Sequence, residues 1–315
     1  MADYYYHGFR DYQQARKELS AARQTLPNNP QVFEYSGYIE RRQGDWASAT
    51  HDFERSIELD PRNFHTIQQF ALTYQLQHRY ADQLRALDRA LTIVPDDLST
   101  LVLRAWVPAD WRADLRPFQQ LRANLMEKDP AAANDIEDIN YALCERTPEA
   151  ISRTLAAYPA EGNVYNGIKY PRAYWEGVVA RWRGEKEKAS LAFAEARRQV
   201  EEVAAKQPDF PAALTLLGLI DAGLERKDDA LREARRACEL LPMTADAVDG
   251  VAYAANLAQV YIWTGEKDLA VEQLANVERV PNLLSYGYLK LQPLWDPLRG
   301  DPRFEKIVAS LAPKD

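Results

Sequence analysis

Prolines recur at a fixed interval along this chain. Pro27, Pro61 and Pro95 are evenly spaced, and the separation of Pro208 and Pro242 repeats the same interval. The interval is about 34 residues, and a constant period of this size predicts a stack of similar structural units, because a single unit cannot bury its apolar face without a neighbour. Glycine is scarce, at 13 of 315 residues, which favours helices over turn-rich β architecture.

The clearest unit spans residues 30–63 and contains two helical patterns. Phe33 and Gly37 recur at helical spacing in its first half, and Ala49 and Phe53 do so in its second half. This spacing predicts two helices, each with one apolar stripe. Gly37 and Ala49 are small, and we expect the helices to cross closely there, since larger side chains would push them apart. The corresponding small residues of two later units are Ala71 and Gly218.

The period of the prolines and the segment GDWASATHDFERSIELDPRN, residues 44–63, resemble the tetratricopeptide repeat (TPR) family. The resemblance implies an all-α fold: a right-handed α-solenoid of about eight TPR-like helix-turn-helix units with a C-terminal capping helix. A narrower resemblance links YYYHGFRDYQQA, GYIERRQGDW and YGYLKLQPLWDPLRGDPRF to the C-terminal repeat region of a group of large bacterial signalling proteins. In that group a Ser/Thr kinase, nucleotide cyclase or winged-helix domain precedes the repeats. The resemblance therefore implies that this chain is the sensory or partner-binding part of a longer protein.

The repeats suggest a division of the chain into five parts. We expect a partial first repeat (1–29), N-terminal TPR units (30–130), a degenerate repeat with an irregular hinge (131–171), C-terminal TPR units (172–280) and a C-terminal cap (281–315). The chain begins at what matches the second helix of a unit, which also predicts that further sequence precedes Met1 in a longer protein. A natural start with a shortened first helix is the alternative.

Three local signals give further expectations. Pro108 should end the first helix of the fourth unit near Val107, because proline lacks the N–H that continues a helix. Residues 162–171 have turn chemistry and no apolar periodicity, which predicts an irregular segment. Near the C-terminus, the Asp-Pro pairs at Asp296 and Asp301 each predict a capped helix start.

Charge and hydropathy exclude two classes of partner. The formal net charge is −8, and no long Lys/Arg run occurs, which argues against nucleic acid as a partner. The most apolar stretch, residues 211–220, is about half the length that spans a bilayer, so we expect no membrane insertion by this segment. Two well-separated cysteines, Cys144 and Cys238, favour a reducing compartment. We expect the cytoplasm, or the periplasm if the segment belongs to a membrane receptor.

Motifs for chemistry are absent from the sequence. It contains no glycine-rich nucleotide loop, kinase catalytic-loop signature or nucleophile motif. Metal-ligand spacing is also lacking around the four histidines, which are His7, His51, His65 and His78. We therefore expect a protein or peptide as the partner, no enzymatic activity, no cofactor and no metal. The alternative is an enzyme with its site in the irregular 108–171 region, which a perturbed acid or nucleophile in a pocket would support.

The TPR resemblance also implies a binding surface. In that family the first helices of the units line a concave, peptide-binding groove. The matching positions here mix amide, aromatic and guanidinium groups, which suit an extended peptide because amides satisfy backbone polar groups and large side chains act as anchors. The implied groove residues are Gln31, Glu34, Tyr38, Arg41, Arg42, His65, Gln68, Leu72, Gln75, Val102, Trp106, Tyr174, Val178 and Arg181.

Arg41 and Arg42 suggest the chemistry of the partner. Both lie on the expected inner face, where a guanidinium pairs bidentately with carboxylates and can stack on aromatic rings. We predict that the second to fourth units bind a peptide of acidic character. The alternative is structural ion pairing, since Glu40 and Asp45 are close enough in sequence to neutralise these arginines.

Overall fold

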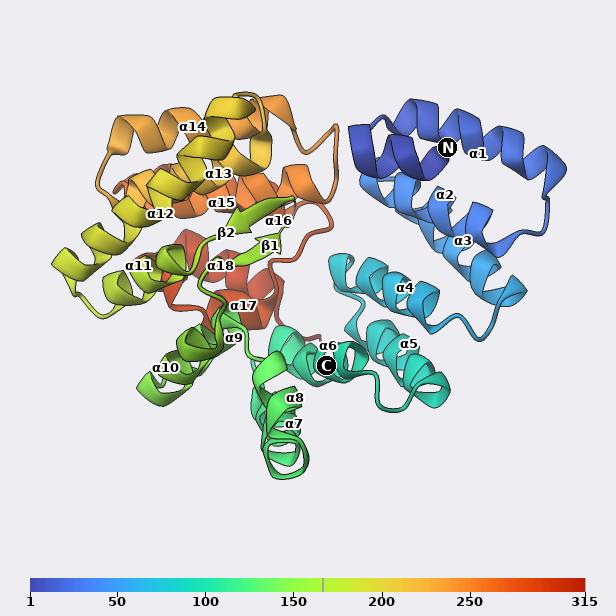
Figure 1. Cartoon of the computed structure of the whole chain (residues 1–315), viewed down its shortest axis with the longest axis horizontal. Helices are drawn as coiled ribbons and strands as arrows, with labels where there is room; N and C mark the ends of the chain where they lie inside the picture. The colour runs from blue at the N-terminus through green and yellow to red at the C-terminus, as the bar shows by residue number, and fades with distance from the viewer. Residues whose placement is uncertain (166, 315) are drawn as a thin grey trace. The chain divides into compact units, whose positions relative to one another are not determined.

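The computed structural model describes residues 1–165 and 167–314, and its chain trace is shown in Figure 1. The fold is all-α, as the sequence predicts, with one short hairpin as the exception. Helices adjacent in sequence pack as pairs. The chain divides into two compact units, of which unit 1 comprises residues 1–107, 244–248 and 281–283, and unit 2 comprises the rest.

The helices of unit 1 follow the period of the prolines. They are η1 (Tyr4–Phe9), α1 (Tyr12–Thr25), α2 (Pro30–Arg42), α3 (Trp46–Leu59), α4 (Phe64–Leu76), α5 (Tyr80–Ile93) and the first part of α6 (Leu98–Arg112). The helices α2, α4 and α6 begin at Pro30, Phe64 and Leu98, which are separated by the same interval as the prolines. The repeat predicted from the sequence is therefore confirmed in unit 1.

Side-chain caps that recur with the same period fix where these helices begin. Asp11 and Asp45 are one period apart, and each accepts a hydrogen bond from a backbone N–H three residues later, at the starts of α1 and α3. Asn29 and Asn63, also one period apart, each accept from a backbone N–H in the first turn of α2 and α4. Such a cap satisfies a backbone donor that the helix cannot, and contributes about 1 kcal/mol.

The paired helices α2 and α3 cross at Gly37, as predicted. A Cβ atom added at Gly37 would lie 3.0 Å from the ring of Phe53, and Ala49 and Phe53 are completely buried. The ring of Phe53 also lies 5.8 Å from that of Phe70 on α4. Gly37 thus allows α2 and α3 to pack closely, and Phe53 packs this helix pair against α4 of the next pair.

Unit 2 continues the pairing of helices. It contains the rest of α6, then α7 (Arg116–Lys128), α8 (Pro130–Asp135), α9 (Ile139–Glu145), α10 (Pro148–Ala157), β1 (Asn163–Tyr165), β2 (Ile168–Tyr170), α11 (Arg172–Trp182), α12 (Lys186–Lys206), α13 (Pro211–Gly223), α14 (Lys227–Leu240), α15 (Asp249–Trp263), α16 (Lys267–Glu278), α17 (Tyr286–Leu291), η2 (Pro293–Leu298) and α18 (Pro302–Ser310). A Cβ atom at Gly218 would lie 2.9 Å from that of Ala234, so α13 and α14 also cross at the predicted small residue. The last helix, α18, packs on α16 and buries Phe304, Ile307 and Val308, as expected of a capping helix.

The structure corrects the prediction at Pro108. Helix α6 does not end near Val107 but continues through Pro108 to Arg112. An interior proline removes one backbone hydrogen bond, and its neighbours Val107 and Ala109 are both 1% exposed. Burial of this stretch offsets the lost bond, which propensity alone does not register.

The segment expected to be irregular forms a hairpin. Strands β1 and β2 are antiparallel, with Asn163 opposite Tyr170 and Tyr165 opposite Ile168. The hydroxyl of Tyr158 fixes the open end, because it donates to the carbonyl of Tyr170 at 3.2 Å and accepts from the N–H of Asn163 at 3.2 Å. The Asn-Gly pair at residues 166–167 is a sequence signal for a two-residue hairpin connection.

Only one of the two Asp-Pro pairs starts a helix. Asp301 caps α18, as predicted, by accepting from the N–H of Arg303 at 2.9 Å. The prediction for Asp296 is wrong, because this residue lies inside η2. Its carboxylate instead pairs with Arg146 at 2.7 Å and with Arg299 at 2.7 Å. The chain around Asp296 already belongs to the 3-10 helix that begins at Pro293, so no helix starts at this residue.

Candidate functional site

The predicted groove residues on α2 are mostly engaged inside unit 1. Tyr38 donates to the carboxylate of Glu34 at 2.6 Å, and both residues are buried. Arg41, which is 5% exposed, donates to the carbonyl of Gln69 at 2.9 Å and to the hydroxyl of Thr73 at 3.2 Å. Burial raises the pKa of Tyr38 and lowers the pKa of Arg41. Arg41 thus links α2 to α4, whereas the Tyr38–Glu34 hydrogen bond lies within α2.

Arg42 has an acidic partner far away in the sequence. Its guanidinium lies 3.1 Å from the carboxylate of Asp246, which is completely buried and also accepts from the hydroxyl of Tyr12 at 2.6 Å. The N–H of Ala247 donates to the carbonyl of Arg42 at 2.6 Å. Asp246 is therefore a structural partner of this arginine that the sequence analysis did not name.

A second short segment is held in the same way at the end of α4. The N–H of Asn282 donates to the carbonyl of Leu76 at 2.8 Å, and the Nε2 atom of His78 lies 3.0 Å from the carbonyl of Asn282. Unit 1 thus holds residues 244–248 and 281–283 at the C-terminal ends of two successive first helices. In each case a helix carbonyl accepts from the backbone of the segment.

The remaining predicted residues of unit 1 differ in exposure. Gln31 and His65 are exposed, Leu72, Gln75 and Val102 are half-buried, and Trp106 is buried. The half-buried amide of Gln68 donates to the carboxylate of Asp97 at 2.9 Å. The predicted groove residues of unit 1 therefore lie on three first helices, and only some of them are accessible to a partner.

The predicted groove residues of unit 2 lie in its core or at its edge. Tyr174 and Val178 are 3% and 1% exposed, and the ring of Tyr174 lies 4.8 Å from that of Trp175. The half-buried Arg181 places its guanidinium 4.9 Å from the ring centre of Trp263. Packing thus accounts for Tyr174 and Val178, while Arg181 stacks on an aromatic ring.

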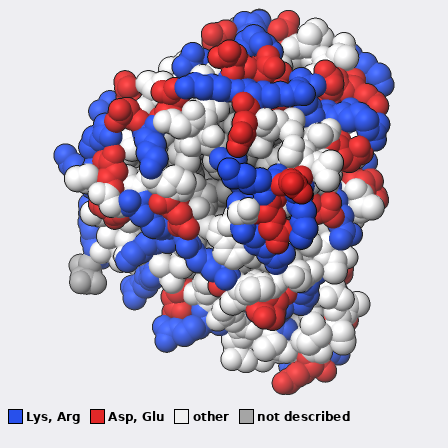
Figure 2. Space-filling view, turned by 90° about the vertical axis from the view of Figure 1, so that its left-hand side faces the viewer, with Lys and Arg blue, Asp and Glu red and all other residues white. Residues whose placement is uncertain are grey.

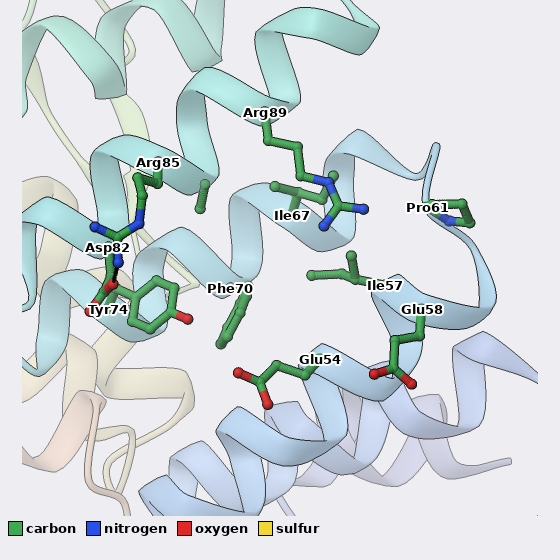
Figure 3. Close-up of a pocket in the computed structure, with 11 residues that line it drawn as sticks. Glu54, Ile57, Glu58, Pro61, Ile67, Phe70, Tyr74, Asp82, Arg85 and Arg89 are labelled. Carbon is green, nitrogen blue, oxygen red and sulfur yellow. Dashed lines mark hydrogen bonds and ion pairs between the residues drawn. The ribbon is translucent and has the colours of Figure 1, made fainter.

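A pocket of about 450 Å³, which the sequence analysis missed, lies between α3, α4 and α5 (Figure 3). Its floor is apolar and consists of buried residues, among them Ile57, Ile67 and Phe70. Phe70 packs against Tyr74, with ring centres 4.3 Å apart. A volume of this size is in the range of ligand-binding pockets.

Two glutamates line the α3 edge of this pocket, and two arginines together with Asp82 line the α5 edge. Figure 3 shows Glu54 and Glu58 on the α3 edge and Arg85 and Arg89 across from them on the α5 edge. Glu58 and Arg85 each pair with a neighbour on their own helix. Within the described part of the chain, the side chains of Glu54 and Arg89 make no hydrogen bond or ion pair. Both are exposed, so their charges remain available to a ligand.

The region proposed for an enzyme site contains several groups with a shifted pKa, among them a thiol and a carboxylate. Burial raises the pKa of the Cys144 thiol, so the thiol stays protonated at neutral pH and is a poor nucleophile. Burial also raises the pKa of Asp138, whose carboxylate caps α9 by accepting from the N–H of Asn140 at 2.8 Å. Each group thus has a structural role, since the thiol is buried in the core and the carboxylate caps a helix.

The described residues offer neither a metal site nor a membrane-spanning helix. No cluster of three or more His, Cys, Asp or Glu side chains able to hold a metal ion occurs among them. None of the helices in the described ranges is both long and apolar enough to cross a bilayer. Basic and acidic side chains are interspersed over the face seen in Figure 2.

The paired helices and their constant period define this chain as an all-α helical repeat protein. No family model matches it, and no curated protein matches it. Solved structures similar to it include a tetratricopeptide repeat protein from Parabacteroides merdae ATCC 43184, with 13% identity, 94% of each chain covered and a TM-score of 0.34. PilW, a type IV pilus biogenesis factor, has 17% identity over 79% of this chain and 92% of its own, with a TM-score of 0.31. Naa15/Naa10 bound to HypK has 13% identity over 100% of this chain and 63% of its own, with a TM-score of 0.35. Global similarity is low in each case, and the fold described above rests on the helix pairing of this chain itself.

Proposed function

We propose that this chain is a non-catalytic scaffold that binds a segment of a partner protein through the first-helix face of unit 1. The supporting observation is how unit 1 holds residues 244–248. Arg42 pairs with the carboxylate of Asp246, and its carbonyl accepts from the N–H of Ala247. A charged side-chain anchor combined with a main-chain hydrogen bond is a common way to hold an extended peptide.

The proposed partner segment is acidic and extends along the accessible first-helix positions. Gln31 and His65 are exposed, and Leu72, Gln75 and Val102 are half-buried. Polar and apolar groups along successive helices suit a peptide that alternates side chains between solvent and the surface. The mode of holding seen at Asp246 supports acidic rather than basic character for such a segment.

We also propose that this scaffold is the partner-binding part of a larger bacterial signalling protein. The segments YYYHGFRDYQQA and YGYLKLQPLWDPLRGDPRF, which resemble the repeat region of such proteins, support this proposal. Sequencing the gene upstream of Met1 tests it. An in-frame kinase, cyclase or winged-helix domain is expected, and a stop codon directly upstream contradicts the proposal.

The binding proposal is tested with a matched pair of charge variants. The probe is a pool of short fluorescein-labelled peptides with Asp or Glu at alternate positions, titrated into the full chain. His65→Glu adds a negative charge to α4 on the first-helix face, and His51→Glu adds the same charge to α3, where the histidine is also exposed. We expect His65→Glu to weaken binding about two- to fivefold, since an exposed charge pair is worth about 0.2–1 kcal/mol.

The control variant, His51→Glu, should leave the affinity for the peptides unchanged. Raising the salt concentration should weaken wild-type binding, because exposed charges are screened. If no member of the pool binds saturably, or if both histidine variants lose the same affinity, the first-helix face is not the acidic-segment site.

A further inference from the structure

Successive repeats of unit 1 pack against each other, and each such contact is called a junction here. A residue at one junction has an equivalent at the next junction, one period later in the sequence. At the first junction, Arg23 bridges two helices by donating to Asp52 at 2.7 Å and to Ser36 at 3.3 Å. The residues one period later, at the second junction, are Ile57, Ala86 and Phe70. All three members of the polar bridge are therefore replaced by apolar residues.

This replacement opens the pocket at the second junction. The polar bridge leaves a cavity of about 180 Å³ at the first junction, compared with about 450 Å³ at the second. Ala86 contributes to the difference in cavity volume, because its side chain is smaller than that of Asp52 and does not reach the neighbouring helices. At the third junction Arg104 pairs with Asp88, and these two residues are the equivalents of Phe70 and Glu54, one period later. The second junction thus combines an apolar floor with a larger cavity than the first.

The pocket also lies on a different side of α4 from the first-helix face. Ile67, Phe70 and Tyr74 line it, and their helical spacing places them on one side of α4. His65 and Leu72 are offset from them around the helix axis and point elsewhere. The pocket is thus a separate surface from the one proposed above for an acidic segment.

We infer that this pocket binds a segment of a partner protein that inserts one Leu- or Phe-sized side chain between an acidic and a basic residue. The apolar floor fits the inserted side chain, since large apolar anchors in enclosed pockets carry most of the energy of such contacts. Arg89 receives the acidic residue and Glu54 receives the basic one, because each is exposed and without an ion-pair partner in the described structure. The two charges face each other across the opening (Figure 3), so they fix the direction in which the segment lies.

The test uses short fluorescein-labelled peptides and the full chain. Two pools carry a central Phe or Leu between an acidic and a basic residue, one pool for each order of the charges, and a third pool has Ala at the centre. Fluorescence polarisation is followed to millimolar concentrations. We expect one charge order to bind more tightly than the other, and both to bind more tightly than the Ala pool.

Two variants with matched controls locate the binding. Ala86→Phe fills the pocket, whereas Ala81→Phe puts the same ring on an exposed part of α5 that does not line it. Arg89→Glu reverses the charge at the rim, and Arg279→Glu does so at an exposed site in unit 2. We expect Ala86→Phe to lower affinity at least about tenfold and Arg89→Glu to lower it several-fold while reducing the preference for one charge order.

Several outcomes overturn the inference. These are the absence of saturable binding by either charged pool, equal binding of the Ala pool, and unchanged binding by folded Ala86→Phe and Arg89→Glu variants. If urea titration shows that Ala86→Phe is unfolded, the exposed Arg89→Glu substitution decides alone. His65→Glu should leave this binding intact, which separates the pocket from the first-helix face.

Discussion

At the scale of single residues, an acid beside the polar bridge of the first junction has a shifted pKa. Burial raises the pKa of Glu40 to about 7, and the negative charge of Asp52 adds to the shift. The other charged groups near Glu40 are Arg16, Asp45 and Arg23. An acid whose pKa is higher in the folded than in the unfolded state favours folding when protonated. Its contribution is therefore complete below about pH 4.5 and is lost as the pH rises to about 7.

Replacing Glu40 with Gln should remove this pH dependence, because the amide does not ionise. We expect wild type to lose stability relative to Glu40→Gln between about pH 4.5 and about pH 8. Urea midpoints measured across that range give the comparison. Glu58→Gln is the control, since Glu58 is exposed. A constant difference between wild type and Glu40→Gln at all pH values would show that the Glu40 pKa is ordinary.

At the scale of helices, the close crossing of α2 and α3 sets a limit on side-chain size. Gly37→Leu forces extra atoms against the Phe53 ring, which a Cβ atom alone would already approach to 3.0 Å. We expect a loss of about 1–3 kcal/mol or more from overpacking, measured by urea unfolding. Glu58→Leu, at an exposed position of α3, should cost far less. Equal midpoints for the two variants would contradict the assigned register.

How well the helices could be predicted depends on whether their signals are local. The small residue at Gly37 acts within one helix pair, so spacing in the sequence reveals it. The continuation of α6 through Pro108 depends on burial of Val107 and Ala109, which no local rule contains. The strands at residues 163–165 and 168–170 had an Asn-Gly signal between them in the sequence, but they lack the apolar alternation that usually marks strands.

The first-helix face and the pocket could also be predicted only where their determinants are close together in the sequence. The sequence pointed to Arg42 as a carboxylate-binding residue, but the partner found in the structure, Asp246, is 204 positions away, and no spacing rule connects them. The pocket at the second junction follows from comparing Arg23 with Ile57, its equivalent one period later. That comparison becomes informative only once the structure shows that Arg23 bridges two helices.

At the scale of the whole molecule, each compact unit is built from separate stretches of the sequence. Unit 1 takes residues 244–248 and 281–283 from between helices that belong to unit 2. These short segments supply Asp246 and Asn282, which bind to the ends of α2 and α4. A substitution between α14 and α15 should therefore affect helices near the N-terminus.

Asp246→Ala tests this long-range dependence in the full chain. The substitution leaves Arg42 and the Tyr12 hydroxyl without the buried carboxylate that binds both. Breaking a buried ion pair from one side costs about 3–5 kcal/mol, and we expect the lower end because Arg42 keeps 22% of its side chain exposed. Hydrogen exchange should show lost protection in α1 and α2, with a smaller loss for Asp246→Asn, which keeps an acceptor of the same shape. Asp96→Ala, at an exposed turn of unit 1, should change neither helix. If Asp246→Ala exchanges like wild type in α1 and α2, then Asp246 does not stabilise the N-terminal repeats.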